Sequence, residues 1–188
     1  MNRKDFSLPP NGETVLSIVK NAGLEVRAVG KISDIYSDQG ITSSYPAKTN
    51  EMGIDRTIGL IKEEFSGMIM TNLVDFDTMY GHRRDVEGYA EALYYFDNRL
   101  PEIMNSLDDD DVLIITADHG NDPTFTGSDH TREMIPILIY GKNIKKGVNI
   151  GVRNTFADIG SSICSLLELS PTEYGKSFTS EIINMAYA

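Results

Sequence analysis

Each of the three histidines in this chain has an aspartate close to it in the sequence. Imidazole nitrogen and carboxylate oxygen together are typical ligands of a divalent ion such as Zn²⁺ or Mn²⁺. A single histidine would more often be a structural or surface residue, but the shared acidic neighbours favour a metal centre. The pairs are Asp77 with His82, Asp118 with His119, and Asp129 with His130.

The first candidate segment covers residues 72–84, NLVDFDTMYGHRR. A strand is predicted to end at Val74, and the loop beyond it presents Asp77 and His82. Gly81 lets the backbone turn tightly at this point. We therefore expect Asp77 and His82 to converge on one ion.

Three further charged residues in this segment each allow two interpretations. Asp75 is a competing metal ligand, but it could instead orient a ligand or cap the next helix. Arg83 and Arg84 could bind phosphate, and pairing with neighbouring acids is equally consistent with the sequence.

The second candidate segment covers residues 116–133. A hydrophobic strand delivers Asp118 and His119 at its carboxyl end, and the following loop returns His130. Adjacent residues on an extended strand point to opposite sides, so Asp118 and His119 share an ion only if the chain bends. Gly120 permits that bend. The Asp-His-Gly triplet alone is a weak signal, whereas its combination with a downstream Asp-His-Thr and an upstream Asp-x4-His is strong.

Apolar β-branched runs alternate along the chain with segments of helical periodicity, a pattern typical of an α/β fold. We expect a mostly parallel sheet with helices on both faces. Pro101 predicts a kink or a restart in the third helix. Buried strands are predicted at 25–30, 67–74, 111–117 and 135–141, and helices near 14–21, 55–65, 86–107 and 155–169.

Composition excludes several classes of partner. The net charge of −11 argues against nucleic acid, because phosphate backbones require a basic face. No apolar run reaches the roughly 20 residues of a membrane-spanning helix, and the first residues lack the apolar core of a signal peptide. We therefore expect no membrane partner and a cytoplasmic location. Cys164, the single cysteine, is predicted to be a small core residue rather than a nucleophile.

Three segments resemble a known family closely: residues 29–42 (VGKISDIYSDQGIT), 72–85 (NLVDFDTMYGHRRD) and 115–133 (ITADHGNDPTFTGSDHTRE). They are similar to the phosphopentomutases, which belong to the alkaline phosphatase superfamily together with the cofactor-independent phosphoglycerate mutases. The resemblance runs from Asn2 to Phe178 and so covers nearly the whole chain.

This resemblance implies an alkaline-phosphatase-like α/β core that is incomplete here, because the family's N-terminal half and inserted cap domain have no counterpart. Residues 1–13 would be a linker returning from the missing cap domain. Residues 14–188 would be the C-terminal part of the metal-binding core domain. A sheet edge that the missing half normally pairs would then be exposed, which favours self-association.

The resemblance also implies a site with two Mn²⁺ ions, although Zn²⁺ or another divalent ion is compatible with the same ligands. One ion would be held by Asp77, His82 and His130. The other would be held by Asp118 and His119 with further ligands from the N-terminal part. The nucleophilic threonine of the family also belongs to that part, so no catalytic residue is expected within this chain.

The implied activity is the interconversion of ribose or deoxyribose 1-phosphate and 5-phosphate through a phosphothreonine, with a pentose phosphate as the substrate. Lys31 is a predicted substrate-phosphate contact, and its alternative is a solvated lysine at a strand end. We expect the 188 residues alone to be inactive.

Three other functions stay open. One is a metal-dependent phosphatase of the same superfamily, and another is a non-catalytic metal-binding fragment. The third is a phosphoglycerate mutase, whose corresponding loop typically reads Asp-Met-Val-Gly-His and is one residue shorter than Asp77 to His82.

Overall fold

The computed structural model describes residues 7–184, which fold as two compact units. Within these residues, unit 1 comprises 7–46, 64–71 and 143–184, and unit 2 comprises 47–63 and 72–142. The first part of the predicted linker at 1–13 lies outside the described residues. The assignment of 14–188 to one core domain of a larger protein stays a prediction.

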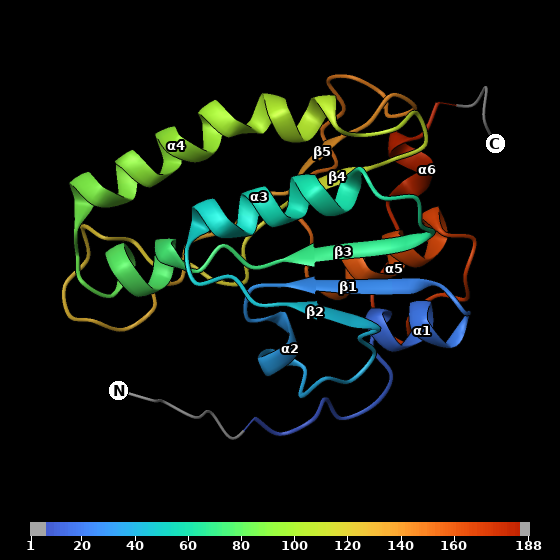
Figure 1. Ribbon diagram of the computed structural model, residues 1–188, viewed down its shortest axis with the longest axis horizontal. Helices are drawn as coiled ribbons and strands as arrows, with labels where there is room; N and C mark the ends of the chain where they lie inside the picture. The colour runs from blue at the N-terminus through green and yellow to red at the C-terminus, as the bar shows by residue number, and fades with distance from the viewer. Residues whose placement is uncertain (1–6, 185–188) are drawn as a thin grey trace. The chain divides into compact units, whose positions relative to one another are not determined.

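Unit 1 contains a three-stranded parallel sheet in the order β2-β1-β3 (Figure 1). Its strands are β1 (Glu25–Val29), β2 (Ser43–Tyr45) and β3 (Gly67–Thr71). This sheet confirms the predicted α/β class and two of the predicted strands. Strand β2 escaped prediction because its sequence, SSY, is short and polar.

Helices α1 (Val15–Asn21) and α5 (Ala157–Leu166) also belong to unit 1. Leu16 and Val19 of α1 are fully buried in one cluster with Val26 and Ala28 of β1. Burying side chains of this size stabilises the fold by roughly 1.5–3 kcal/mol each for leucine and valine. Thr14 begins α1 with a capping box, in which its side chain accepts from the Ser17 amide at 3.3 Å.

The other side of β1 is buried as well. Arg27 is 6% exposed, and its guanidinium lies 3.9 Å from the centre of the Phe65 ring. Cys164 of α5 is fully buried, as predicted. Two single-turn helices complete unit 1, α2 (Ile32–Ile35) and α6 (Thr179–Ile182); both are too short to give a periodic pattern in the sequence.

Unit 2 is built on α3 (Asn50–Ile61) and α4 (Val86–Asn105). Their apolar sides meet in a cluster that contains Ile54, Ile58 and Ile103. Helix α4 runs through Pro101 as one element, so the predicted restart does not occur. Arg99, two residues before the proline, donates to Asp55 of α3 at 2.7 Å, and this contact together with the apolar cluster holds α4 against α3 on both sides of the proline.

The remaining strands, β4 (Leu113–Ile115) and β5 (Leu138–Tyr140), form a separate antiparallel pair in unit 2. The expectation that both belong to a buried parallel sheet is therefore wrong for these two strands. The connection between them contains no helix that could carry the chain back to the opposite edge, so the chain returns antiparallel. Leu138 and Tyr140 are 58% and 45% exposed, so β5 is not buried either.

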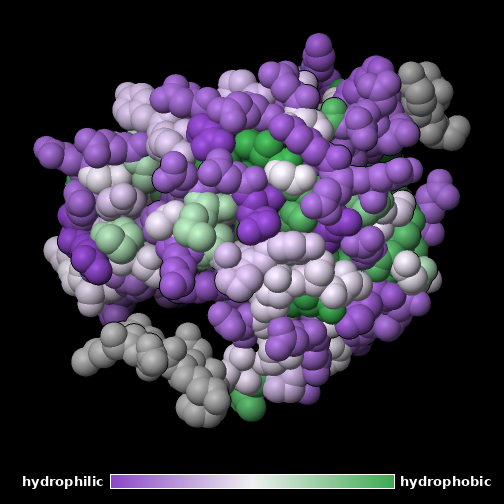
Figure 2. All heavy atoms as spheres, viewed as in Figure 1, coloured by the Kyte–Doolittle hydropathy of each residue, from purple (hydrophilic) through white to green (hydrophobic). Residues whose placement is uncertain are grey.

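Hydrophilic residues cover most of the face shown in Figure 2, and apolar residues appear in scattered patches. This pattern agrees with the strongly acidic composition. Among residues 7–184, no helix combines the length and the apolar character needed to cross a membrane.

Candidate metal centre

A short π-helix, η1 (Phe76–Gly81), follows β3 in the chain and positions the first two candidate ligands. The amide of His82 donates to the carbonyl of Asp77, five residues earlier, at 3.1 Å. The π-helix places residues five apart, rather than four, one turn above each other. Asp77 and His82 therefore lie on the same side of this turn.

The chain bends at Asp118 and His119, three residues after the end of β4, and such a bend is the condition under which both side chains could share an ion. Gly120 then pairs with Thr131, whose amide donates to the Gly120 carbonyl at 3.0 Å. A Cβ atom on Gly120 would lie 2.9 Å from the backbone nitrogen of Glu133, so any other residue would require the backbone to shift. The pairing returns the loop and brings His130 beside His119.

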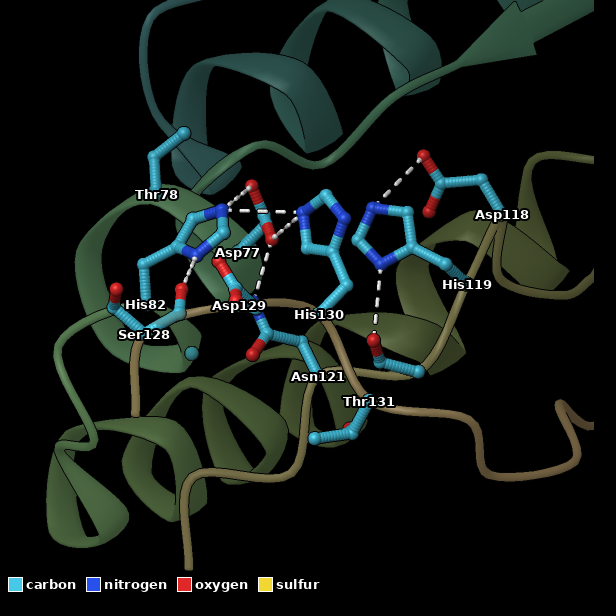
Figure 3. A network of polar contacts seen from close by, with 12 residues as sticks. Asp77, Thr78, His82, Asp118, His119, Asn121, Ser128, Asp129, His130 and Thr131 are labelled. Atoms are coloured by element: carbon cyan, nitrogen blue, oxygen red, sulfur yellow. Dashed lines mark hydrogen bonds and ion pairs between the residues drawn. The ribbon is translucent and has the colours of Figure 1, made fainter. Parts of the chain in front are cut away.

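Asp77, His82 and His130 point toward one another (Figure 3). The Nε2 atom of His82 lies 3.3 Å from Asp77 Oδ2, and that of His130 lies 3.3 Å from Asp77 Oδ1. The two Nε2 atoms are 3.1 Å apart. Two ligands about 2.1 Å from one ion are roughly 3.0–3.4 Å from each other at octahedral or tetrahedral angles. The three side chains therefore have the mutual separations that one divalent ion requires.

The outer nitrogen of His82 supports the same interpretation. Its Nδ1 atom lies 2.5 Å from the carbonyl oxygen of Ser128, which can only accept a hydrogen bond. The proton of a neutral His82 is therefore on Nδ1, and the lone pair of Nε2 faces Asp77 and His130. Backbone carbonyls commonly fix metal-binding histidines in this way.

His119 and Asp118 lie next to this triad. The His119 ring stacks on the His130 ring with a centroid separation of 3.8 Å, and its Nε2 lies 3.7 Å from Asp118 Oδ2. Asp77, His119 and His130 also offer ligand atoms within 4.8 Å of one another. The separations of 3.1–3.3 Å among Asp77, His82 and His130 are well inside that limit, and we regard these three as the tighter set. All five predicted ligands thus lie in one cluster, with His130 between His82 and His119 (Figure 3).

Carboxylates, including that of Asp77, make the electrostatic potential at Tyr89 negative. Burial raises the pKa of Tyr89, and the nearby carboxylates of Asp77, Asp122 and Glu133 raise it further. Carboxylates that disfavour a phenolate at Tyr89 favour a cation at the same place. A divalent ion would therefore be attracted to this site.

Asp75, the competing ligand, is occupied elsewhere in unit 2. Its carboxylate accepts from the backbone amide of Asn50 at the start of α3, at 2.7 Å. Asp75 therefore caps a helix, although that helix precedes it in the chain rather than follows it. Capping, the alternative to ligation, agrees with this contact.

Neither interpretation of Arg84, phosphate binding or pairing with acids, matches its contacts. The guanidinium instead donates to backbone carbonyls and to the side-chain oxygen of Asn121, at 2.9 Å for the latter. Asn121 donates in turn to Asp77 Oδ1 at 2.6 Å. No sequence pattern indicates Asn121, because one asparagine after an Asp-His-Gly triplet carries no recognisable chemistry by itself.

Lys31 lies in unit 1, at the residue that precedes α2, and is exposed. The five candidate ligands belong to unit 2. The role of Lys31 as a phosphate contact stays a prediction.

Comparison with known proteins gives the family context of this site. The family model described as the metalloenzyme superfamily matches residues 13–171. The phosphopentomutase of Alkaliphilus oremlandii is 56% identical over 182 residues, which are 97% of this chain and 47% of that protein. The phosphopentomutase of Clostridioides difficile is 54% identical over 96% of this chain and 46% of its own length. That of Desulfitobacterium hafniense is 50% identical over 97% of this chain and 47% of its own length. The chain thus spans about half the length of the curated relatives it matches.

Proposed function

The chain belongs to the metalloenzyme superfamily, and from this premise we propose that it is the metal-binding part of a phosphopentomutase. The observation that carries the proposal is the mutual contact of Asp77, His82 and His130 at 3.1–3.3 Å. Relatives with this name align with 97% of the chain at 50–56% identity. The substrates would be ribose or deoxyribose 1-phosphate and 5-phosphate, and the location would be the cytoplasm, where such sugar phosphates are metabolised.

Asp77, His82 and His130 would hold one of two Mn²⁺ ions, and Asp118 and His119 would provide part of the shell of the other. Nitrogen and oxygen ligands of this kind suit Mn²⁺ and leave Zn²⁺ compatible. When bound, such ions neutralise phosphoryl oxygens and favour in-line displacement.

Within this chain, the hydrogen bond from His82 Nδ1 to Ser128 would keep the imidazole lone pair facing the ion. Lys31 would bind the phosphate of the substrate. The phosphoryl group would pass from a threonine oxygen outside the matched segment to a sugar hydroxyl. The resulting bisphosphate would return its other phosphoryl group to that threonine.

The π-helix η1 favours this function over a phosphoglycerate mutase. In those enzymes, as the resemblance has it, three residues separate the corresponding aspartate and histidine, whereas four separate Asp77 and His82. The extra residue between Asp77 and His82 is taken up here by the i to i+5 hydrogen bond of the π turn. The spacing of five is thus built into the local backbone.

A chimera tests the proposal. The matched segment of the Alkaliphilus oremlandii protein is replaced by the corresponding residues of this chain, and the product is assayed with Mn²⁺. We expect interconversion of ribose 1-phosphate and ribose 5-phosphate, and loss of that activity in a His82→Ala chimera of unchanged circular dichroism. A folded, Mn²⁺-binding chimera that releases only inorganic phosphate would identify a phosphatase, and one that interconverts phosphoglycerates would identify the other mutase class. A folded chimera without any of these activities would favour the non-catalytic metal-binding alternative.

A further inference from the structure

Arg84 lies two residues after a candidate ligand, but its side chain faces the loop that carries another. Its guanidinium makes five hydrogen bonds, four to backbone carbonyls and one to a side-chain amide. The Nη1 atom donates at 2.8–3.1 Å and Nη2 at 2.6 Å. The acceptors are the carbonyls of Gly81, Asp122, Gly127 and Asp129 and the side-chain oxygen of Asn121.

Three of these carbonyls, those of Asp122, Gly127 and Asp129, belong to the loop between His119 and His130. The Arg84 guanidinium therefore holds this loop at three positions. A guanidinium has five N–H groups, and these contacts leave at most one of them, on Nη2, for any ligand. Arg84 is therefore fully engaged in holding the loop and is poorly available to a substrate phosphate.

The contact with Asn121 fixes the direction of a second hydrogen bond. Arginine can only donate, so the oxygen of the Asn121 amide must face Arg84. The amide nitrogen then faces Asp77 and donates to Oδ1 at 2.6 Å. Asn121 is 8% exposed, so water competes little for either bond. Arg84 thus orients Asn121, and Asn121 orients the Asp77 carboxylate.

Two features of the backbone show that this arrangement has strict requirements. A Cβ atom on Gly81 would lie 2.4 Å from Asn121 Nδ2, so the amide fits only over a glycine. Arg84 itself has a φ of 56°, in the left-handed region that disfavours non-glycine residues. The side-chain contacts of Arg84 offset the free-energy cost of its backbone conformation.

We propose that Arg84 and Asn121 are positioning residues of the Asp77–His82–His130 site, which set its metal affinity without contacting the ion. Arg84 fixes the loop that ends at His130, and Asn121 fixes the rotation of the Asp77 carboxylate. Outer residues of this kind typically change metal affinity by about 10- to 100-fold when they are replaced. The inference rests on the proposed metal site.

The test measures Mn²⁺ affinity of the 188-residue chain by the electron paramagnetic resonance signal of free Mn²⁺. Arg84→Ala and Arg83→Ala each remove one positive charge, and Arg83 is exposed and makes no hydrogen bond or ion pair within residues 7–184. We expect Arg84→Ala to weaken binding about 10- to 100-fold and Arg83→Ala to leave it within about twofold. Arg84→Lys should not rescue binding, because one ammonium group cannot reach five acceptors in the plane of a guanidinium.

Further variants separate positioning from folding. Arg84→Gly relieves the left-handed backbone but removes the side chain, so it should recover thermal stability relative to Arg84→Ala without recovering Mn²⁺ affinity. Asn121→Leu keeps a similar side-chain volume. It should weaken Mn²⁺ binding although Asn121 does not contact the ion. The d–d absorption of bound Co²⁺ should also change in both variants, because the orientation of Asp77 changes.

The outcomes distinguish the two proposals. A parent chain that binds no Mn²⁺, or that binds it equally well after His82→Ala, would overturn the metal site itself. The positioning role alone would be overturned by a different result. In that case the parent chain binds Mn²⁺ through His82, and the folded Arg84→Gly and Asn121→Leu variants keep the Mn²⁺ affinity and the Co²⁺ spectrum of the parent.

Discussion

Asn50 and Asp75 are joined by two reciprocal hydrogen bonds, each from the backbone amide of one residue to the side chain of the other. The Asn50 amide donates to Asp75 Oδ2 at 2.7 Å, and the Asp75 amide donates to Asn50 Oδ1 at 2.9 Å. Asn50 begins α3 and is 5% exposed, whereas Asp75 directly precedes η1. The pair therefore anchors the π turn that carries Asp77 and His82 to the start of a packed helix.

Replacement of Asp75 tests this anchoring role. Asp75→Ala leaves the buried Asn50 amide without its acceptor and should lower the free energy of unfolding by about 1–3 kcal/mol. Asp75→Asn keeps one acceptor oxygen and should cost less. Urea unfolding measures both values, and Mn²⁺ titration of the same proteins gives the control. If Asp75→Asn removes Mn²⁺ binding as completely as His82→Ala does, Asp75 is a ligand and not only a cap.

The candidate metal ligands should fall into two classes of affinity. Asp77, His82 and His130 are within 3.1–3.3 Å of one another, whereas Asp118 is largely exposed and lies 3.7 Å from His119. We expect the first class to bind Mn²⁺ or Zn²⁺ more tightly, because its donors need less rearrangement.

Calorimetric titration can separate these classes. The double variant His82→Ala, His130→Ala should lose the tighter binding, and Asp118→Ala should affect only the weaker binding. Unchanged tight binding in the double variant, with circular dichroism like that of the parent, would contradict the assignment.

The sequence predicted the candidate ligands because they lie at strand ends and turns, where residue type and local spacing carry the signal. It could not predict the contact between Arg84 and Asn121, which joins positions 37 residues apart. An arginine next to another arginine is as typical of phosphate binding as of a loop contact, and only the folded chain distinguishes these roles.

The fold shows the same division between local and distant information. Apolar residues dominate strands β1 and β3 and predicted the existence of both, but burial as predicted is found only in β1, because all five residues of β3 are partly exposed. The run that becomes β5 is equally apolar. Its antiparallel direction depends on a connection to β4 that contains no helix, and its exposure depends on which segments pack against it. The hydrophobic pattern alone predicts neither the direction nor the exposure of this strand.

Cys164 provides a test of core packing in unit 1. Its thiol is fully buried on α5, and burial raises its pKa. Between the ordinary pKa and the folded pKa, the thiol ionises in the unfolded chain but not in the folded one, so its contribution to stability falls as the pH rises through this range. Alkylation by iodoacetamide at pH 8 should be at least about tenfold slower in the folded chain than in urea. Equal rates would show that α5 does not bury this residue in solution.

The exposed strand β5 should promote self-association of the 188-residue chain. Within residues 7–184 it pairs only with β4, and Leu138 is 58% exposed. Such an edge offers unpaired backbone groups and apolar side chains to a second copy. Sedimentation at increasing concentration should show dimers or larger species.

A lysine on the strand should suppress this association. Leu138→Lys places a charge on the edge, while Leu93→Lys, at a position that is 50% exposed on α4, is the matched control and should have little effect. A parent chain that stays monomeric at high concentration would argue against an open sheet edge.

The 188 residues alone should not interconvert ribose 1-phosphate and ribose 5-phosphate, even with Mn²⁺ and a bisphosphate activator. The chain spans 46–47% of its phosphopentomutase relatives, and the family resemblance places the phosphoryl-carrying threonine in the unmatched part. Metal ligands by themselves cannot replace that nucleophile. Addition of the unmatched part of a relative as a separate polypeptide should restore measurable turnover.

Hydroxyl groups near the metal cluster give this prediction a second check. Thr116 donates to the Pro136 carbonyl, Thr124 to the Asp122 carboxylate and Thr131 to the Glu133 carboxylate. Each hydroxyl thus donates to a group that is not one of the five candidate ligands. If the chain alone showed Mn²⁺-dependent turnover above a metal-free control, the nucleophile would have to lie within it. Alanine replacement of Thr116, Thr124, Thr126, Ser128 and Thr131, one at a time, would then identify the residue by loss of a phosphorylated intermediate in mass spectrometry.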